Sequence, residues 1–136
     1  MPTLTLKNRK EELERIVSFI DWFSIGKNFS ENYIFDLNLI LDEICTNIIR
    51  HGEIMSEDSE IEISLETDEN DCIIKVKDEG KEFNPVKYEP YDLNMKIEDR
   101  PVGNLGIVLV KAKCDEINYD RNDGRNILLM KKHLES

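Results

Sequence analysis

One face of apolar side chains, repeated at helical spacing between residues 30 and 52, constrains the fold of this chain more than any other feature. At roughly 100° per residue, the following side chains share that face: Tyr33, Ile34, Leu37, Ile40, Leu41, Ile44 and Ile48. Ser30 is a favoured N-cap residue, and Gly52 suits the position after a C-cap, so we expect a helix from about 31 to 51. Such a face must be buried against a second layer of structure.

The other periodic segments predict what that layer is. Alternation predicts a short strand at 3–6, and helical spacing predicts helices over 11–25 and 105–114. Two hairpins are expected, one from 61–66 and 72–76, the other from 117–131 around Asn122-Asp123-Gly124. The order β-α-α-β-β-loop-α-β-β predicts an α+β fold, a two-layer sandwich of a mixed, mostly antiparallel sheet with helices on one face.

Length and charge narrow the class of protein. The chain has 136 residues without a linker or repeat, so we expect a single domain over 1–136. A net charge of −11 and the lack of a basic stripe disfavour nucleic acid as a partner. No apolar run has the length of a membrane span, and the N-terminus lacks a secretory pattern, so we expect a cytoplasmic protein. Cys45, Cys72 and Cys114 lie far apart in apolar segments, which favours small buried residues over a metal or redox site.

Polar residues interrupt the edge of the long helix. Glu43 and Asn47 lie one turn apart on the shoulder of its apolar face, and His51 follows one turn later. An amide oxygen ligates Mg²⁺ without adding charge, and a carboxylate orders a water or accepts a proton. Taken alone, this pattern is more typical of a solvated helix edge with a histidine whose hydrogen bonds are satisfied.

Two glycine-containing loops favour the functional interpretation. Asp78 and Gly80 follow an apolar strand directly, where a carboxylate can accept a hydrogen bond from an exocyclic amine and a glycine lets a flat ligand approach the backbone. Gly103 and Gly106 open an apolar helix, and free backbone N–H groups at a helix start bind anions. Each loop alone is also typical of a plain turn. The P-loop pattern and the motifs of eukaryote-type protein kinases do not occur in the sequence.

Between these loops, residues 86–102 show no clean periodicity and contain Pro90 and Pro101. A connection of this length inside a compact domain is often a functional lid.

Together the three segments resemble the histidine-kinase-like ATPase superfamily, which gyrase, Hsp90, MutL and sensor kinases share. Residues 41–52 look like its N box, 78–85 like its G1 box and 103–110 like its G2 box. The pattern Thr-Asn-x-x-x-His-Gly and the loop Asp-x-Gly-x-x-Phe-Asn-Pro resemble most closely the bacterial anti-sigma factor serine kinases. The resemblance covers nearly the whole chain.

The resemblance implies a role for each matching residue. Glu43 would be the general base for a serine hydroxyl, Asn47 would bind Mg²⁺, and Asp78 with Gly80 beside it would bind the adenine of ATP. Gly103 and Gly106 would frame the phosphates, Arg100 would meet the γ-phosphate, and 86–102 would be the ATP lid. Two positions depart from the family: Asn104 stands where a second glycine is frequent, and Arg125 or Asn126 replaces the hydroxyl that usually assists the aspartate.

The resemblance also implies function and partners. We expect an ATP-binding anti-sigma factor with serine kinase activity, which would phosphorylate an antagonist protein, capture a sigma factor and form a homodimer. The alternative is a nucleotide-gated binding module without kinase activity. A detached sensor-kinase domain is disfavoured, since neither His51 nor His133 lies on a dimerisation helix.

Overall fold

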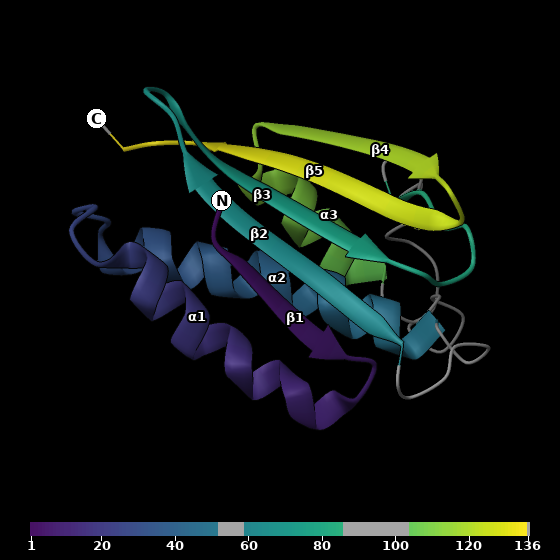
Figure 1. The fold of residues 1–136 in the computed structure, drawn as a ribbon. Helices are drawn as coiled ribbons and strands as arrows, with labels where there is room; N and C mark the ends of the chain where they lie inside the picture. Colours follow the sequence, from purple (N-terminus) through teal and green to yellow (C-terminus); the bar gives the residue numbers. More distant parts are fainter. Residues whose placement is uncertain (52–58, 86–103, 136) are drawn as a thin grey trace.

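A five-stranded sheet forms one layer of the molecule. The computed structural model describes residues 1–51, 59–85 and 104–135, and the lid expected over 86–102 lies outside them. The strands follow the order β1-β2-β3-β5-β4 across the sheet (Figure 1). They span Thr3–Lys7 (β1), Glu60–Thr67 (β2), Asp71–Asp78 (β3), Glu116–Asn122 (β4) and Arg125–His133 (β5).

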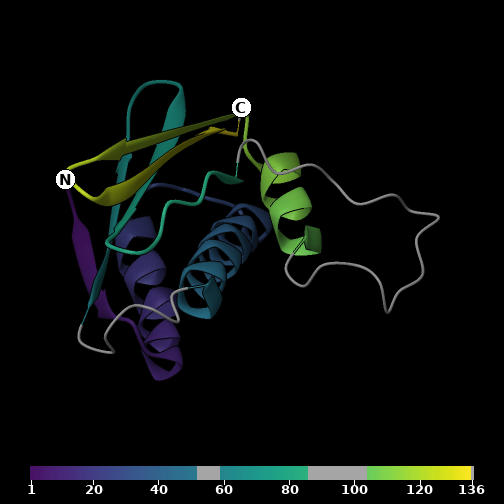
Figure 2. The same cartoon turned by 90° about the vertical axis from the view of Figure 1, so that its right-hand side faces the viewer.

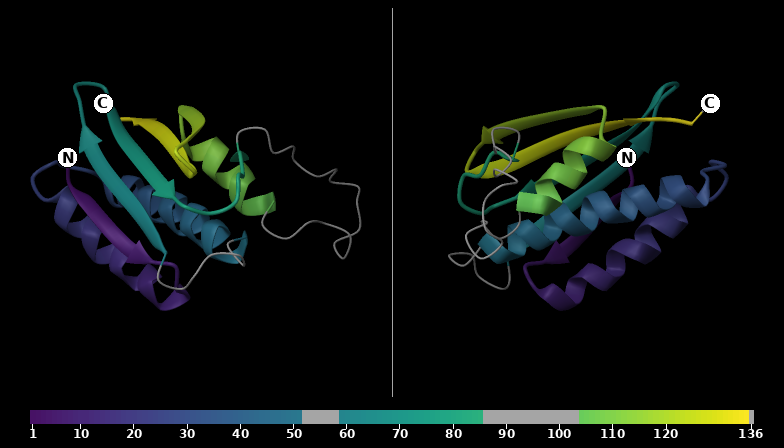
Figure 3. Two further views of the ribbon diagram at one scale, coloured as in Figure 1. Left: turned by 45° about the vertical axis from the view of Figure 1, so that its right-hand side comes forward. Right: turned by 180° about the vertical axis from the view of Figure 1, so that it is seen from behind.

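The helices form the second layer. They are a short 3₁₀ helix η1 (Lys10–Leu13), α1 (Glu14–Ser24), α2 (Glu31–His51) and α3 (Asn104–Lys113). All of them cover the same face of the sheet, with α2 between α1 and α3 (Figure 3). The predicted two-layer α+β architecture is therefore confirmed. None of the described helices is long and apolar enough to cross a membrane.

The core lies between the two layers and follows the predicted periodicities. On α2, Leu37, Ile40 and Leu41 are fully buried, and they form one face of the helix as expected. On β2, Ile61, Ile63 and Leu65 are fully buried, and the side chains between them belong to the partly exposed Glu62 and the buried Ser64. Burying such large side chains is the main favourable term that holds the layers together.

All four strand pairings among the described residues are antiparallel, whereas the sequence pattern suggested a partly mixed sheet. The difference arises because β5, and not β4, lies beside β3. The connection through α3 carries the chain from β3 to β4, which point the same way but are separated by β5.

Local chemistry fixes the ends of these elements. The hydroxyl of Ser30 accepts a hydrogen bond of 3.1 Å from the backbone N–H of Tyr33, which is the predicted N-cap of α2. The turn between β4 and β5 places Asp123 and Gly124 at φ angles of 52° and 75°. Two consecutive positive φ angles are typical of the tight hairpin turn that Asp-Gly favours.

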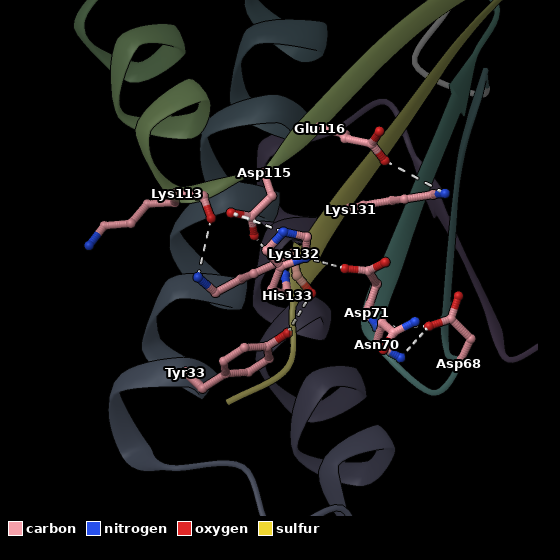
Figure 4. Close-up of polar contacts among 10 residues, drawn as sticks. All are labelled: Tyr33, Asp68, Asn70, Asp71, Lys113, Asp115, Glu116, Lys131, Lys132 and His133. Carbon is pink, nitrogen blue, oxygen red and sulfur yellow. Dashed lines mark hydrogen bonds and ion pairs between the residues drawn. The ribbon is translucent and has the colours of Figure 1, made fainter. Parts of the chain in front are cut away.

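At one end of the sheet, side chains bind β5 to the helical layer and to its neighbouring strands (Figure 4). Lys132 Nζ donates to the carbonyl oxygen of Lys113 at 3.2 Å, and the Tyr33 hydroxyl donates to the carbonyl oxygen of Lys132 at 3.0 Å. His133 Nδ1 contacts the carboxylate of Asp71, and the backbone N–H of His133 donates to Asp115. These contacts hold the end of the β3–β5 ladder that lies away from Asp78.

Candidate functional site

A pocket opens at the other end of the sheet, between α2, α3 and the ends of β3, β4 and β5. Figure 2 looks onto this end of the molecule. The space between these elements that holds no protein atom is about 510 Å³, and part of it is open to solvent. Its lining includes Asn47, Asp78 and Gly80 together with apolar side chains from both layers, among them Ile44, Ile48, Val76, Phe83, Ile107 and Leu128. Three residues predicted from two separate motifs, the long helix and the first glycine-containing loop, thus line one cavity.

Asp78 is the last residue of β3 and is only 6% exposed. Its Oδ1 accepts hydrogen bonds from the backbone N–H of Gly80 at 2.8 Å and from Nδ2 of Asn126 at 3.1 Å. Burial raises the pKa of this carboxyl, and the two hydrogen bonds and the positive charge of Arg121 oppose that rise. The arrangement leaves Asp78 as a buried acceptor in a mostly apolar pocket.

Asn126, rather than Arg125, supplies the second contact to Asp78. The amide of Asn126 is 6% exposed and lies directly across the ladder from Asp78. Arg125 instead forms an ion pair of 3.4 Å with Glu79 at the surface. The sequence offered both residues as candidates, and strand alternation separates them, because neighbours in a strand point to opposite faces.

Glu43 lies against the first turn of α3. A Cβ atom built on the buried Gly106 would overlap Oε2 of Glu43 and come within 2.9 Å of its Cδ. Only a residue without a side chain fits at position 106 while the carboxylate keeps this place. The predicted base and the predicted phosphate-loop glycine are therefore in contact, across the junction of α2 and α3.

Asn47 lies one turn further along α2 and is 4% exposed. Within the described ranges, its buried Nδ2 has no hydrogen-bond partner. An unsatisfied buried amide donor costs about 1–3 kcal/mol, and such a group is a common mark of a ligand site. Asn47 thus presents an amide to the pocket that the described protein does not satisfy.

The side chains beside the pocket could bind Mg²⁺ only if a bound substrate supplied further oxygen ligands. No group of three or more His, Cys, Asp or Glu side chains in the described residues could hold a metal. Mg²⁺ prefers hard oxygen ligands and usually keeps several waters, with one or two protein ligands plus substrate phosphates. The amide oxygen of Asn47 fits that second mode, while its unpaired Nδ2, a donor, suits an oxygen of the ligand rather than the metal.

Arg100 and Gly103 lie outside the described residues, so the structure does not test their roles. Asn104 is the first residue of α3, one position before the start that we predicted. Sequence reasoning missed Tyr119 and Arg121, both of which contact Asn126 at the base of the pocket. Alternation along β4, combined with the Asp-Gly turn, would have put both residues on the inner face.

Curated relatives with similar sequences share one description. Serine-protein kinase RsbW of Bacillus mycoides is 34% identical over 101 residues, covering 71% of this chain and 62% of the relative. The protein of the same name from Bacillus cereus is 33% identical over 108 residues, covering 76% of this chain and 66% of the relative. This chain therefore spans slightly less than two thirds of the length of these relatives.

Solved structures with a similar fold are more distant in sequence. The RsbU and RsbW domains of a Mycobacterium tuberculosis protein match with a TM-score of 0.65 at 14% identity, over 98% of this chain and 33% of that one. The SiaB–SiaC complex from Pseudomonas aeruginosa matches with a TM-score of 0.61 at 10% identity, over 98% of this chain and 90% of that one. At these identities the likeness shows the fold alone.

The family comparison covers the pocket and nearly all of the sheet and helices. The family described as Histidine kinase-like ATPase domain matches residues 6–132. That range includes α2, both predicted glycine loops and the β4–β5 hairpin. The chain belongs to the histidine kinase-like ATPase domain family.

Proposed function

We propose that this chain is an ATP-binding anti-sigma factor that phosphorylates a serine of an antagonist protein and captures a sigma factor. The observation that carries the proposal is the contact between Glu43 and Gly106, beside the pocket that Asn47 and Asp78 line. This contact puts a proton acceptor next to the helix start where a phosphate would bind. The names of the curated relatives support a serine in a protein as the acceptor.

In this proposal each predicted residue has one task. Asp78 accepts the exocyclic amine of adenine, with Gly80 allowing the base to come close. Gly103, Gly106 and Arg100 bind the phosphates, and Asn47 binds the Mg²⁺ that neutralises their charge. The oxygen of the serine hydroxyl attacks the γ-phosphorus, Glu43 accepts the proton of that hydroxyl, and ADP departs. Catalysis of this kind depends mainly on position and charge neutralisation.

We also propose that the chain is a cytoplasmic homodimer. The strand β1 lies at the edge of the sheet, and an edge strand offers unpaired backbone groups to a partner. Beside it, Leu4, Phe19 and Trp22 contribute to a groove between β1 and α1, and Trp22 is 58% exposed. A second copy of the chain would cover this apolar surface.

A phosphotransfer assay tests the kinase proposal. We expect transfer of the γ-phosphate from ATP to a purified antagonist, seen by mass spectrometry as a phosphoserine. Glu43→Gln should reduce the rate by about 10²- to 10⁴-fold, the usual contribution of a general base, while ATP affinity changes little. Asp42→Asn is the matched control, because it removes an exposed carboxylate one residue away on the same helix.

Two results would contradict the proposal. An unchanged rate for Glu43→Gln would remove Glu43 from the chemistry. ATP-dependent binding of the antagonist by the wild-type protein without any transfer would favour the nucleotide-gated binding module instead.

A further inference from the structure

Two contacts at opposite ends of α3 fix how this helix lies along α2. At one end, Lys113 Nζ is 3.3 Å from Oδ1 of Asp36. At the other end, Gly106 lies against the carboxylate of Glu43. Positions 36 and 43 on α2 meet positions 113 and 106 on α3, so the two helices run antiparallel. On each helix the two positions are about two turns, or about 10 Å, apart, so both contacts belong to one register.

A lysine of the sheet joins the first of these contacts (Figure 4). Nζ of Lys132 on β5 is 3.4 Å from Oδ2 of Asp36 and donates to the carbonyl oxygen of Lys113 at 3.2 Å. Lys113 is the last residue of α3, where carbonyl oxygens lack a partner within the helix and a cation is favourable. Nζ of Lys132 also lies 5.1 Å from the centre of the Tyr33 ring. Asp36, Lys113 and Lys132 thus form a polar clamp between α2, α3 and β5.

The apolar residues of α3 do not specify one orientation of the helix. Ile107, Val108, Leu109 and Val110 are consecutive, so apolar side chains surround the helix instead of forming one stripe. Val108 is 38% exposed, whereas Ile107 and Val110 are buried. Apolar packing has no preferred direction, but buried ionic groups can select one arrangement among several of similar stability. The polar clamp supplies the direction that the apolar residues lack.

The register of α3 matters because Gly106 is the only glycine between Asn104 and Lys113. Turning the helix by one residue moves Gly106 by about 100° and brings a residue with a side chain to face Glu43. The carboxylate would then lose its place, since even a Cβ atom at position 106 overlaps its Oε2. A displacement of about 1 Å in a catalytic group can reduce a rate by about 100-fold.

We infer that Lys132 and Asp36 are positioning residues, which hold α3 in the register that places Gly106 against Glu43. The inference rests on the proposed phosphotransfer, in which Glu43 is the base, and adds the residues that keep this base aligned. Neither Lys132 nor Asp36 lines the pocket. Both act through α3, from the end of the helix that lies away from Glu43.

A double-mutant cycle measures the register without using activity. Glu43→Ala and Gly106→Ala are made alone and together, and urea unfolding gives the coupling free energy between the two positions. We expect the coupling in the wild-type protein and its reduction by at least about two-fold in a Lys132→Met background, because α3 no longer holds Gly106 against the carboxylate.

The choice of Lys132→Met keeps the variant foldable. Methionine retains most of the apolar stem of the lysine, and Asp36 keeps Lys113 as its partner, so no buried charge is left alone. Lys131→Met is the matched control, because it removes the neighbouring lysine of β5, whose ion pair with Glu116 lies at the surface. The coupling should be unchanged in that background.

Phosphotransfer at saturating ATP and antagonist measures the consequence for the chemistry. The kcat of Lys132→Met should fall by about 10- to 100-fold, whereas that of Lys131→Met should stay within about two-fold of the wild-type value. Lys132→Arg retains the charge and the donors, so it should recover most of the lost rate. Adding Gly106→Ala to Lys132→Met should lower kcat little further, since the alignment is already lost. A general loss of stability would instead make the two effects multiply.

The outcomes separate the inference from the proposed function. Reduced coupling together with reduced kcat in Lys132→Met supports the inference. Full coupling in a folded Lys132→Met overturns it, and so does reduced coupling with an unchanged kcat. If Lys132→Met does not fold, the same two measurements on Asp36→Asn decide, because this variant keeps the side-chain shape but removes the charge that both lysines contact. A wild-type protein that transfers no phosphate refutes the proposed function, and the coupling then still decides whether Lys132 sets the register of α3.

Discussion

The contact between Glu43 and Gly106 makes a quantitative prediction about stability. Alanine is favoured over glycine in a helix interior by up to about 1 kcal/mol, so Gly106→Ala should stabilise α3 by itself. The new methyl group would overlap Oε2 of Glu43, however, and the carboxylate would have to leave its place. Rotation of a flexible side chain away from its preferred conformer costs about 0.5–1.5 kcal/mol. The two effects nearly cancel, so Gly106→Ala alone should change stability little.

A double-mutant cycle separates the two effects. In a Glu43→Ala background the carboxylate is gone, and Gly106→Ala should then stabilise the protein by up to about 1 kcal/mol, or raise its melting temperature by about 3 °C. Urea unfolding of the four proteins should give a coupling free energy of about 0.5–1.5 kcal/mol between the two positions. Phosphotransfer by Gly106→Ala should fall by about 100-fold, because a displaced base loses its alignment with the acceptor.

The reasoning fails if the two substitutions are additive. A coupling free energy below about 0.3 kcal/mol would mean that Glu43 does not occupy the space beside Gly106. A large loss of stability in Gly106→Ala that persists in the Glu43→Ala background would point to a clash with another group.

Three further predictions concern the proposed Mg²⁺ site and the end of the sheet that lies away from the pocket. Asn47→Ala should weaken ATP binding in the presence of Mg²⁺ and have less effect in its absence, which calorimetry with and without EDTA would measure. Lys132→Met should lower the free energy of unfolding by about 1–2 kcal/mol, because Lys132 Nζ is 3.4 Å from the mostly buried Asp36. Lys131→Met removes only the ion pair with Glu116 at the surface, so it should change the free energy of unfolding by less than about 0.5 kcal/mol. The hydrogen bond to Asp71 raises the pKa of His133 in the folded protein. The protonated imidazole of His133 therefore stabilises the fold below the unfolded pKa of about 6.5, and this contribution disappears as the pH rises through the higher folded pKa. His133→Asn should therefore lower the melting temperature more at pH 6 than at pH 9.

Local chemistry explains which parts of the fold the sequence predicted well. Ser30 caps a helix that begins beside it, and Asp123-Gly124 forms a turn between adjacent strands. Both features depend only on nearby residues, so the sequence predicted the start of α2 and the last turn correctly. The apolar face of α2 followed from periodicity, and its buried leucines and isoleucines confirm it. On α1, Val17 follows the buried Ile16 and has the same apolar character, yet it is 52% exposed, because periodicity does not say how much of a helix face the sheet covers.

Strand order was the step that local reasoning could not supply. Asp78 and Asn47 came from motifs, but the contact between Asp78 and Asn126 depends on β5 inserting between β3 and β4. A sheet with β4 beside β3 would have had the same hairpins and the same turn residues. The roles of Tyr119 and Arg121 depend on that choice, since both act through Asn126. Long-range pairing is decided by packing across the whole sheet.

The same pairing has a consequence for how the protein folds. The walls of the pocket come from α2, β3, α3, β4 and β5, and Asp78 meets a partner that lies 48 residues away in the chain. Contacts of this separation form slowly, since loop closure precedes any gain from the contact. No partly folded chain that lacks the β3–β5 ladder contains the pocket. A nucleotide that fills the pocket would therefore bind the completed fold alone and shift the folding equilibrium toward it by mass action. We expect the amount of folded protein in a cell to follow the supply of that nucleotide.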